Sequence, residues 1–103
     1  MNILLTGSTG FIGSNLLKKI SKSPKNKVLN LVRTNNKNIK NKNVKYLRCD
    51  LKKLKKYKSK IIKFNPEILI HLAWNKIPNF DYKTSKENET MSINLFKFLD
   101  KYT

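Results

Sequence analysis

The three glycines of this chain share one spacing near its N-terminus: Gly7, Gly10 and Gly13. They separate a short apolar run from an amphipathic one in the stretch MNILLTGSTGFIGSNLLKKI. Glycine between a strand and a helix allows a tight turn and leaves room for a ligand against the main chain. The start of the helix then offers free N–H groups and a partial positive charge, which suit a phosphate group. The pattern predicts a phosphate-binding turn.

The apolar pattern of the whole chain predicts the elements that position this turn. Continuous apolar runs predict buried strands over residues 1–6, 27–33, 44–50 and 65–74. Apolar residues at helical spacing predict helices from residue 11 to the segment around Pro24, over 51–64 and over 86–102, with polar loops over 34–43 and 75–85. Strands that alternate with helices pair in parallel through right-handed crossovers. We therefore expect an α/β fold: the N-terminal half of a Rossmann-like doubly wound parallel sheet, with about four strands and three helices.

A glycine-spaced turn between a strand and a helix is the setting of a dinucleotide-binding fingerprint. In this interpretation Gly7 allows the tight turn, Gly10 lets the backbone approach a pyrophosphate, and Gly13 lets the helix pack closely on the strand. The spacing is G-x-x-G-x-x-G, and not the G-x-G-x-x-G of ordinary dehydrogenases. The alternative is a glycine turn that serves packing alone.

The stretch TGSTGFIG resembles the cofactor loop of the extended short-chain dehydrogenase/reductase superfamily, in its NAD-dependent epimerase/dehydratase group. Three further stretches resemble motifs of that group in the same order: RCDL at 48–51, PEILIHLAW at 66–74 and NETMSINLF at 88–96. Trp74 stands where the group usually has alanine, and Met91 where it has glycine. The resemblance covers essentially the whole chain. It implies the NAD(P)-binding part of a nucleotide-sugar epimerase, dehydratase or reductase.

The resemblance also implies cofactor contacts, residue by residue. The expected cofactor-binding residues are Gly7, Thr9, Gly10, Phe11, Ile12, Gly13, Arg33, Asp50, Leu51, Leu72, Ala73, Trp74 and Asn88. Asp50 matches the acidic residue that hydrogen-bonds the adenine, although it can also cap a helix that starts at Leu51. His71 is expected to be a core histidine and not a catalyst. No metal-binding residue is expected.

The end of the second predicted strand bears on the choice of cofactor. An acidic residue there binds a ribose 2′-hydroxyl, whereas an arginine suits a 2′-phosphate. The stretch LNLVRTNN has no acid and contains Arg33. This favours NADP, with NAD as the second choice. The alternative is that Arg33 is one more surface cation of a basic chain.

No catalytic residue is expected. The family pairs a tyrosine and a lysine as Tyr-x-x-x-Lys on a helix that follows the fifth strand. Tyr82 and Lys86 have this spacing in YKTSK, but they lie before the helix motif that contains Asn88 and not after a fifth strand, and a lysine-rich chain produces such matches by chance. We expect residues 1–103 to be a single NAD(P)-binding Rossmann-type domain, an N-terminal fragment truncated before the fifth strand and the substrate domain.

The formal net charge of +17 is the strongest bias in the composition. It would suit a small basic module that binds nucleic acid. However, the chain has 21 lysines and 14 asparagines but only two arginines, which is typical of an AT-rich genome. Arginine is the better residue for bidentate phosphate contacts, so nucleic-acid binding is the less favoured alternative. A gene remnant without function is a third.

The number of cysteines and the hydropathy of the sequence bear on where in the cell the protein is expected. The single cysteine, Cys49, excludes an internal disulfide and fits a reducing cytosol. No apolar run approaches the roughly 20 residues of a membrane span. We therefore expect a cytoplasmic protein without a membrane partner. The expected partners are a dinucleotide cofactor, a nucleotide sugar in a full-length relative, and a second copy of the chain at the sheet edge that the fourth strand exposes.

Overall fold

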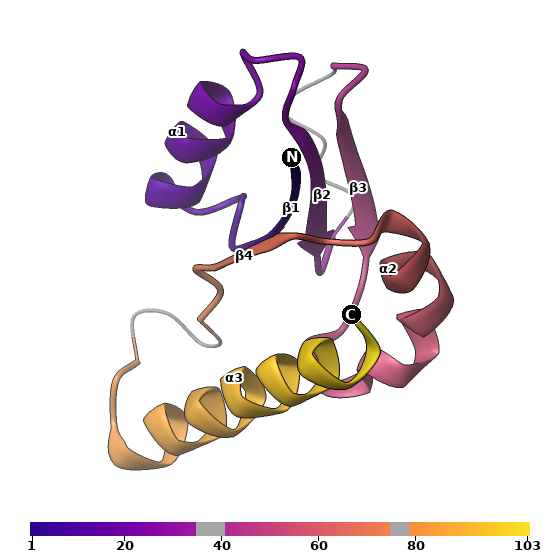
Figure 1. Cartoon of the computed structure of the whole chain (residues 1–103). Helices are drawn as coiled ribbons and strands as arrows, with labels where there is room; N and C mark the ends of the chain where they lie inside the picture. The colour runs from indigo at the N-terminus through magenta and orange to yellow at the C-terminus, as the bar shows by residue number, and fades with distance from the viewer. Residues whose placement is uncertain (35–40, 75–78) are drawn as a thin grey trace.

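The computed structural model describes residues 1–34, 41–74 and 79–103. Its strands are β1 (Asn2–Thr6), β2 (Lys27–Val32), β3 (Val44–Arg48) and β4 (Ile68–His71). They form one parallel sheet in the order β3-β2-β1-β4 (Figure 1). The chain therefore builds outward from β1 to β3 and then returns to the other side of β1. The predicted Rossmann-like, doubly wound parallel sheet is confirmed.

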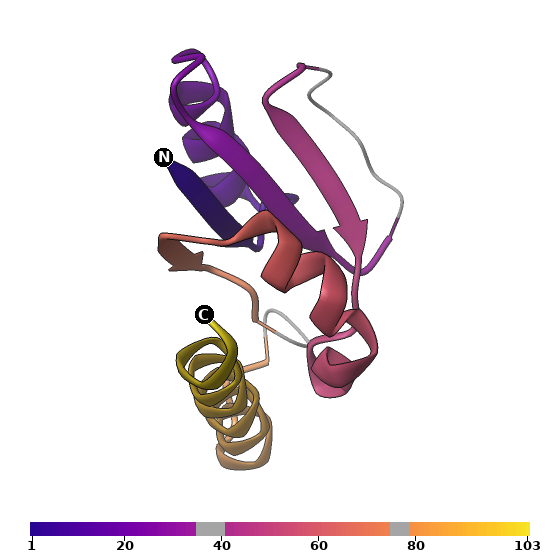
Figure 2. The same cartoon turned by 45° about the vertical axis from the view of Figure 1, so that its right-hand side comes forward.

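Helices cover both faces of this sheet. α1 (Phe11–Ile20) covers one face, and the 3-10 helix η1 (Leu51–Tyr57), α2 (Lys58–Phe64) and α3 (Tyr82–Tyr102) pack on the other. Figure 2 shows α1 behind the sheet and α2 in front of it. No helix in the described part of the chain is long and apolar enough to cross a membrane.

The central strand β1 is buried on both faces, as its continuous apolar run predicts. Ile3 and Leu5 pack with Leu17 of α1, whereas Leu4 faces the opposite cluster, which contains Ile61 of α2. Leu4 and Leu5 have no exposed surface. The alternation of side chains along a strand thus divides the core into two layers with β1 between them.

The predicted single helix over 51–64 is divided in the structure. Residues 51–57 form η1, which is itself kinked at Lys53 (φ −128°, ψ 44°), and α2 follows from Lys58. Leu51 and Leu54 of η1 and Ile61 of α2 are all buried in one core cluster. The spacing of apolar residues does not distinguish a kinked 3-10 segment from a continuous α-helix, because both bury one face.

The start of the last helix was predicted four residues too late. α3 begins at Tyr82, because the Asp81 carboxylate accepts a hydrogen bond of 2.8 Å from the Thr84 N–H and caps the helix. Tyr82 and Lys86 therefore lie on the first two turns of α3, and not before it. The predicted loop over 75–85 ends at Asp81, and its residues 75–78 lie outside the described residues, as do residues 35–40 of the other predicted loop.

The strands are shorter than the predicted segments, most of all β4. The prediction over 65–74 reduces to Ile68–His71. Asn65 closes α2 in the left-handed conformation (φ 56°), so the strand begins only after Pro66 and Glu67. The residues after His71 leave the sheet and approach the end of β1. They lie beside the glycine turn, as the site below shows.

The hydroxyl group of Thr6 holds the end of β4 against the end of β1. Thr6 Oγ1 accepts hydrogen bonds from the backbone N–H groups of Leu72 (3.1 Å) and Ala73 (3.2 Å). These two bonds use its acceptor capacity, so its own proton is donated to His71 Nδ1. One side chain thus fixes the position of two backbone groups next to the glycine turn.

The same chain of hydrogen bonds continues into α3 and fixes the tautomer of His71. Because Nδ1 accepts from Thr6, the proton of the neutral ring lies on Nε2, which donates to Ser92 Oγ at 2.9 Å. Ser92 Oγ donates in turn to the Asn88 carbonyl at 2.9 Å. Burial lowers the pKa of His71 below its usual value. His71 is half-buried and not part of the core as predicted, but both of its ring nitrogens are hydrogen-bonded, and its neutral form joins β1, β4 and α3.

The outer edge of β4 has no strand beside it in the described part of the chain. β4 pairs with β1 alone. Ile68 at this strand is 39% exposed, and Ile93 and Phe96 on the neighbouring α3 are 41% and 51% exposed. Phe96 lies edge-on against the His71 ring, which places it next to the end of β4. The sheet therefore ends in unpaired backbone groups with apolar side chains beside them.

We expect the free energy of unfolding to decrease as the pH is lowered from 7.5 to 5.5. The pKa of His71 is lower in the folded chain than in the unfolded chain, so the unfolded state takes up a proton first. The stabilisation is complete above the unfolded-state pKa of about 6.5 and is lost as the pH falls through the folded-state pKa. Urea titrations at several pH values measure this slope.

His71→Gln is the matching variant, because it removes the only histidine of the chain. The variant should be less stable at pH 7.5 and should show little change between pH 7.5 and 6. A wild-type chain whose stability does not change over this range would contradict the neutral hydrogen-bonded role of His71.

Candidate functional site

The predicted site residues gather at one edge of the sheet. All four strands are parallel, so their carboxyl ends lie together. The glycine turn follows β1, Arg33 follows β2, Asp50 lies shortly after β3, and residues 72–74 follow β4. The strand order reverses between β1 and β4, and a crevice at such a point is where open α/β sheets bind ligands. Gly7 lies at this point.

Gly7 and Gly13 are required by the packing of the chain itself. Gly7 has a left-handed backbone (φ +79°), and a Cβ atom there would lie 2.5 Å from the Leu72 carbonyl carbon. A Cβ atom on Gly13 would lie 1.9 Å from the carbonyl oxygen of Gly7. The predicted tight turn at Gly7 is confirmed. The close packing predicted for Gly13 is also present, and its contact is the turn itself.

Gly10 differs from the other two glycines. A Cβ atom there would meet nothing nearer than the Gly7 carbonyl oxygen at 3.5 Å, an ordinary contact distance. Its backbone angles (φ −77°, ψ 173°) are open to any residue. Packing alone therefore explains Gly7 and Gly13 but leaves Gly10 unexplained. The space over Gly10 fits the close approach of a ligand to the backbone.

The start of α1 has hydrogen-bond donors without partners. Gly10 is the N-cap and supplies no side chain, and the first helical bond runs from the Ser14 N–H to the Gly10 carbonyl at 2.9 Å. The N–H groups of residues 11–13 thus have no acceptor within the helix. In the same turn, the buried hydroxyl of Ser8 has no hydrogen-bond partner among the described residues. This set of donors fits an anionic phosphate group.

Asp50 has the exposed position and free acceptor that its predicted role needs. Its Oδ1 atom accepts a hydrogen bond of 2.9 Å from the Lys52 N–H, so the predicted helix cap is confirmed. The cap uses one oxygen and leaves the second without a hydrogen bond in the described part of the chain. The neighbouring Cys49 is buried, and burial, with a smaller effect of the Asp50 charge, raises its pKa to about 11. Cys49 therefore stays a protonated thiol near neutral pH.

The remaining predicted residues divide into exposed and buried ones. Phe11 and Ile12 are 86% and 68% exposed on the first turn of α1. Thr9, Arg33 and Leu72 are also exposed, whereas Ala73 and Trp74 are half-buried. Leu51 and Asn88 are buried, and the Asn88 side chain donates to the Thr84 carbonyl at 2.9 Å. Cofactor contact by each of these residues stays a prediction.

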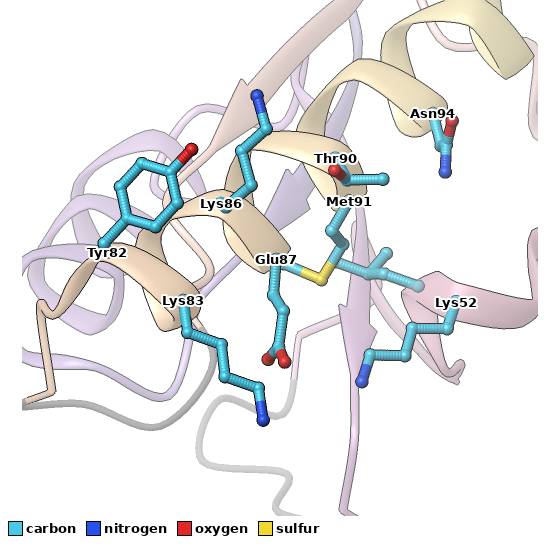
Figure 3. Close-up of a pocket in the computed structure, with 9 residues that line it drawn as sticks. Lys52, Tyr82, Lys83, Lys86, Glu87, Thr90, Met91 and Asn94 are labelled. Carbon is cyan, nitrogen blue, oxygen red and sulfur yellow. The ribbon is translucent and has the colours of Figure 1, made fainter.

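A separate groove of about 580 Å³ lies between η1 and the first half of α3. Leu51 and Met91 contribute apolar surface, and Lys52, Lys83 and Glu87 contribute charge. Figure 3 shows the Lys52 and Lys83 side chains extending toward the same side of the groove as the Glu87 carboxylate. The groove shares only Leu51 with the predicted cofactor residues. Its mixed charge does not match the uniform set of donors at the glycine turn.

Three functional residues escaped the sequence analysis. Thr6 positions Leu72 and Ala73, and the only sequence signal for it was a polar residue that closes an apolar strand. Ser8 supplies the buried hydroxyl of the turn. Phe80 lies against Trp74 with ring centroids 5.4 Å apart. No local pattern predicts the last contact, because the two rings belong to different segments.

Comparison with known proteins gives one family and several related folds. Residues 3–102 match the NAD dependent epimerase/dehydratase family. The Bordetella bronchiseptica enzyme WbmG, solved in complex with NAD, superposes with a TM-score of 0.80 at 20% identity, over 99% of this chain and 34% of that chain. UDP-glucose 4-epimerase from Thermotoga maritima, solved with UDP-glucose, gives 0.76 at 22% identity, over 99% and 35%.

UDP-glucuronic acid 4-epimerase from Bacillus cereus, solved in complex with NAD, gives a TM-score of 0.70 at 25% identity, over 95% of this chain and 35% of that chain. The chain thus spans about a third of the length of these three structures. A comparison with curated proteins found no match. Since the family match runs over nearly all 103 residues, the chain belongs to the NAD dependent epimerase/dehydratase family.

Proposed function

We propose that residues 1–103 are a single NAD(P)-binding Rossmann-type domain, the cofactor-binding part of a nucleotide-sugar epimerase, dehydratase or reductase. The observation that carries the proposal is that Gly10 has room for a side chain yet has none, beside N–H groups that no side chain caps. When bound, the nicotinamide of such a cofactor accepts or donates a hydride. The chain's own residues bind and orient the molecule.

Two parts of the cofactor, the pyrophosphate and the adenine, have proposed partners at the sheet edge. The pyrophosphate accepts hydrogen bonds from the N–H groups at the start of α1, where the helix dipole favours negative charge. The second carboxylate oxygen of Asp50 accepts a hydrogen bond from the adenine amino group. Thr6 holds the backbone of Leu72 and Ala73 in place beside Gly7.

The substrate of the longer protein is proposed to be a nucleotide sugar. Support comes from the related folds, since WbmG was also solved with NAD and UDP, and the Thermotoga maritima epimerase with UDP-glucose. We assign no catalytic residue to this chain. The Tyr82 side chain is 83% exposed, and Lys86 Nζ forms an ion pair with Glu89 Oε1 at 3.3 Å. The single buried thiol of Cys49 supports a cytoplasmic location.

A comparison of substitutions at Gly10 and at Gly13 tests the proposal directly. Gly10→Ser should keep or slightly raise the thermal midpoint, because serine is a good N-cap and the position accepts a side chain. The same side chain fills the space over the turn, so the affinity for NAD(P) should fall at least about tenfold. Gly13→Ala should lower stability by about 1–3 kcal/mol through overpacking against Gly7. Calorimetry for binding and thermal melts for stability measure both effects. Unchanged dinucleotide affinity in Gly10→Ser would refute the proposed site.

NADP is proposed as the preferred cofactor, because Arg33 is exposed directly after β2 and its guanidinium can pair with a 2′-phosphate. We expect the chain to bind NADPH about tenfold more tightly than NADH. Arg33→Ala should remove the preference, whereas Arg48→Ala, which removes the only other arginine, should keep it. Titration followed by calorimetry measures the six affinities, those of the three proteins for each of the two cofactors. Equal affinities of the wild-type chain for the two cofactors would show that Arg33 does not select between them.

A second copy of the chain is the proposed partner at the open edge of β4. Unpaired strand edges with apolar neighbours pair with other chains, and the charge of +17 opposes this at low salt. We expect light scattering to show more association at about 1 M NaCl than at about 0.05 M NaCl. Over this range the Debye length shortens from more than about 10 Å to about 3 Å, so the positive charges repel each other less.

Two isoleucine variants locate the association. Ile68→Lys places a charge at the β4 edge and should suppress it. Ile62→Lys adds the same charge at a position of similar exposure on α2 (37%, against 39% for Ile68) and should leave it unchanged. A cooperative melt and a strictly monomeric wild-type chain at high salt would show that the edge needs no partner.

A further inference from the structure

A partly exposed aromatic pair stands at the carboxyl end of β4. Trp74 is half-buried, and Phe80, which is 65% exposed, lies against it with ring centroids 5.4 Å apart and an angle of 42° between the planes. Adjoining apolar side chains that share an exposed surface can mark a ligand site.

Hydrogen bonds hold this pair in a fixed orientation. The indole N–H of Trp74 donates to the Asn79 carbonyl at 3.1 Å. The side-chain oxygen of Asn79 accepts from the Asp81 N–H at 3.0 Å, and Asp81 caps α3 through Thr84. The Ser85 hydroxyl donates to the Phe80 carbonyl at 3.2 Å. The rings are thus tied to the start of a 21-residue helix.

The other side of Trp74 is tied to the glycine turn. Its neighbour Ala73 donates its N–H to Thr6 Oγ1 at 3.2 Å, and the Ala73 nitrogen would lie 2.7 Å from a Cβ atom on Gly7. Trp74 therefore lies one residue beyond Ala73, whose backbone contacts the phosphate-binding turn.

The strand order shows which end of a dinucleotide reaches this place. Arg33 and Asp50 follow β2 and β3, on one side of the glycine turn, and bind the adenosine in the proposed function. Trp74 follows β4, on the other side of β1. A dinucleotide whose pyrophosphate lies at the turn must extend its second half over β4. That half ends in a flat nicotinamide ring.

We infer that Trp74, oriented by Phe80, stacks against the nicotinamide ring of the bound dinucleotide. This inference rests on the proposed function, and it assigns Trp74 as the residue that distinguishes the oxidised cofactor from the reduced one. The face of an indole is electron-rich, so it attracts the positively charged ring of the oxidised cofactor more than the neutral ring of the reduced one. The aromatic pair thus favours the oxidised form.

The test compares a ligand that has the nicotinamide with one that lacks it. Calorimetry measures the affinity of the whole chain for the oxidised dinucleotide and for the matching ADP-ribose, with the 2′-phosphate on both if NADP is the tighter cofactor. Trp74→Ala should weaken the dinucleotide about fivefold and leave ADP-ribose unchanged. Trp74→Phe should recover most of the loss, and Phe80→Ala should weaken the dinucleotide selectively but less.

A second measurement needs no variant. Trp74 is the only tryptophan, so its fluorescence reports this position alone. The oxidised dinucleotide should quench it strongly, and ADP-ribose should not. Phe96→Ala removes an aromatic ring of α3 that is 51% exposed and lies against His71, and it should leave the ratio of the two affinities unchanged.

The outcomes separate the two claims. An equal loss of affinity for both ligands in Trp74→Ala, or equal quenching by both, overturns the stacking role while the dinucleotide site stands. Binding of neither ligand to the wild-type chain overturns the proposed function and the stacking role with it.

Discussion

The site depends on one backbone contact, in which the carbonyl group of Gly7 lies directly against the α-carbon of Gly13. A single methyl group at Gly13 would lie 1.9 Å from that carbonyl oxygen. This contact sets the position of α1 relative to β1, and therefore the direction of the N–H groups at the start of the helix. The left-handed backbone of Gly7 brings the end of β4 to the same point, where Leu72 approaches it. Two residues without side chains thus place three elements.

Hydrogen bonds extend this constraint into the rest of the fold. Thr6 fixes two N–H groups after β4 and passes its proton to His71, whose ring reaches Ser92 on α3. Every group in this series of hydrogen bonds is neutral, although the protein has a formal net charge of +17. A neutral link is stable in a partly buried place, because no charge has to be removed from water. The glycine turn and the longest helix are therefore coupled through the state of one histidine.

The helix starts differ in a way that separates structure from function. Asp50 and Asp81 cap η1 and α3, and each carboxylate accepts a hydrogen bond from one of the N–H groups at its helix start. α2 has no side-chain cap, but it follows η1 directly. α1 has Gly10 at the same position and leaves its donors open. Capping each helix alike would be the more stable solution for the chain alone. An uncapped start beside a buried Ser8 hydroxyl that has no partner among the described residues is the arrangement expected of a place that a phosphate completes.

The sequence by itself determined the parallel sheet, the glycine turn and the Asp50 cap, because each is written in a local pattern: a run of apolar residues, a spacing of three, a carboxylate before a helix. It did not determine the division of residues 51–64 into η1 and α2 or the kink of η1 at Lys53, because the apolar spacing fits either kind of helix. Nor could it show that Thr6 bonds His71, 65 residues away. Periodicity along a chain records which face is buried. Trp74 and Phe80 lie near each other in the sequence, but no apolar periodicity predicts that their rings meet. Partners that are distant in the sequence are chosen only when strands and helices pack, so tertiary structure alone decided the hydrogen-bonded link from Thr6 through His71 to Ser92.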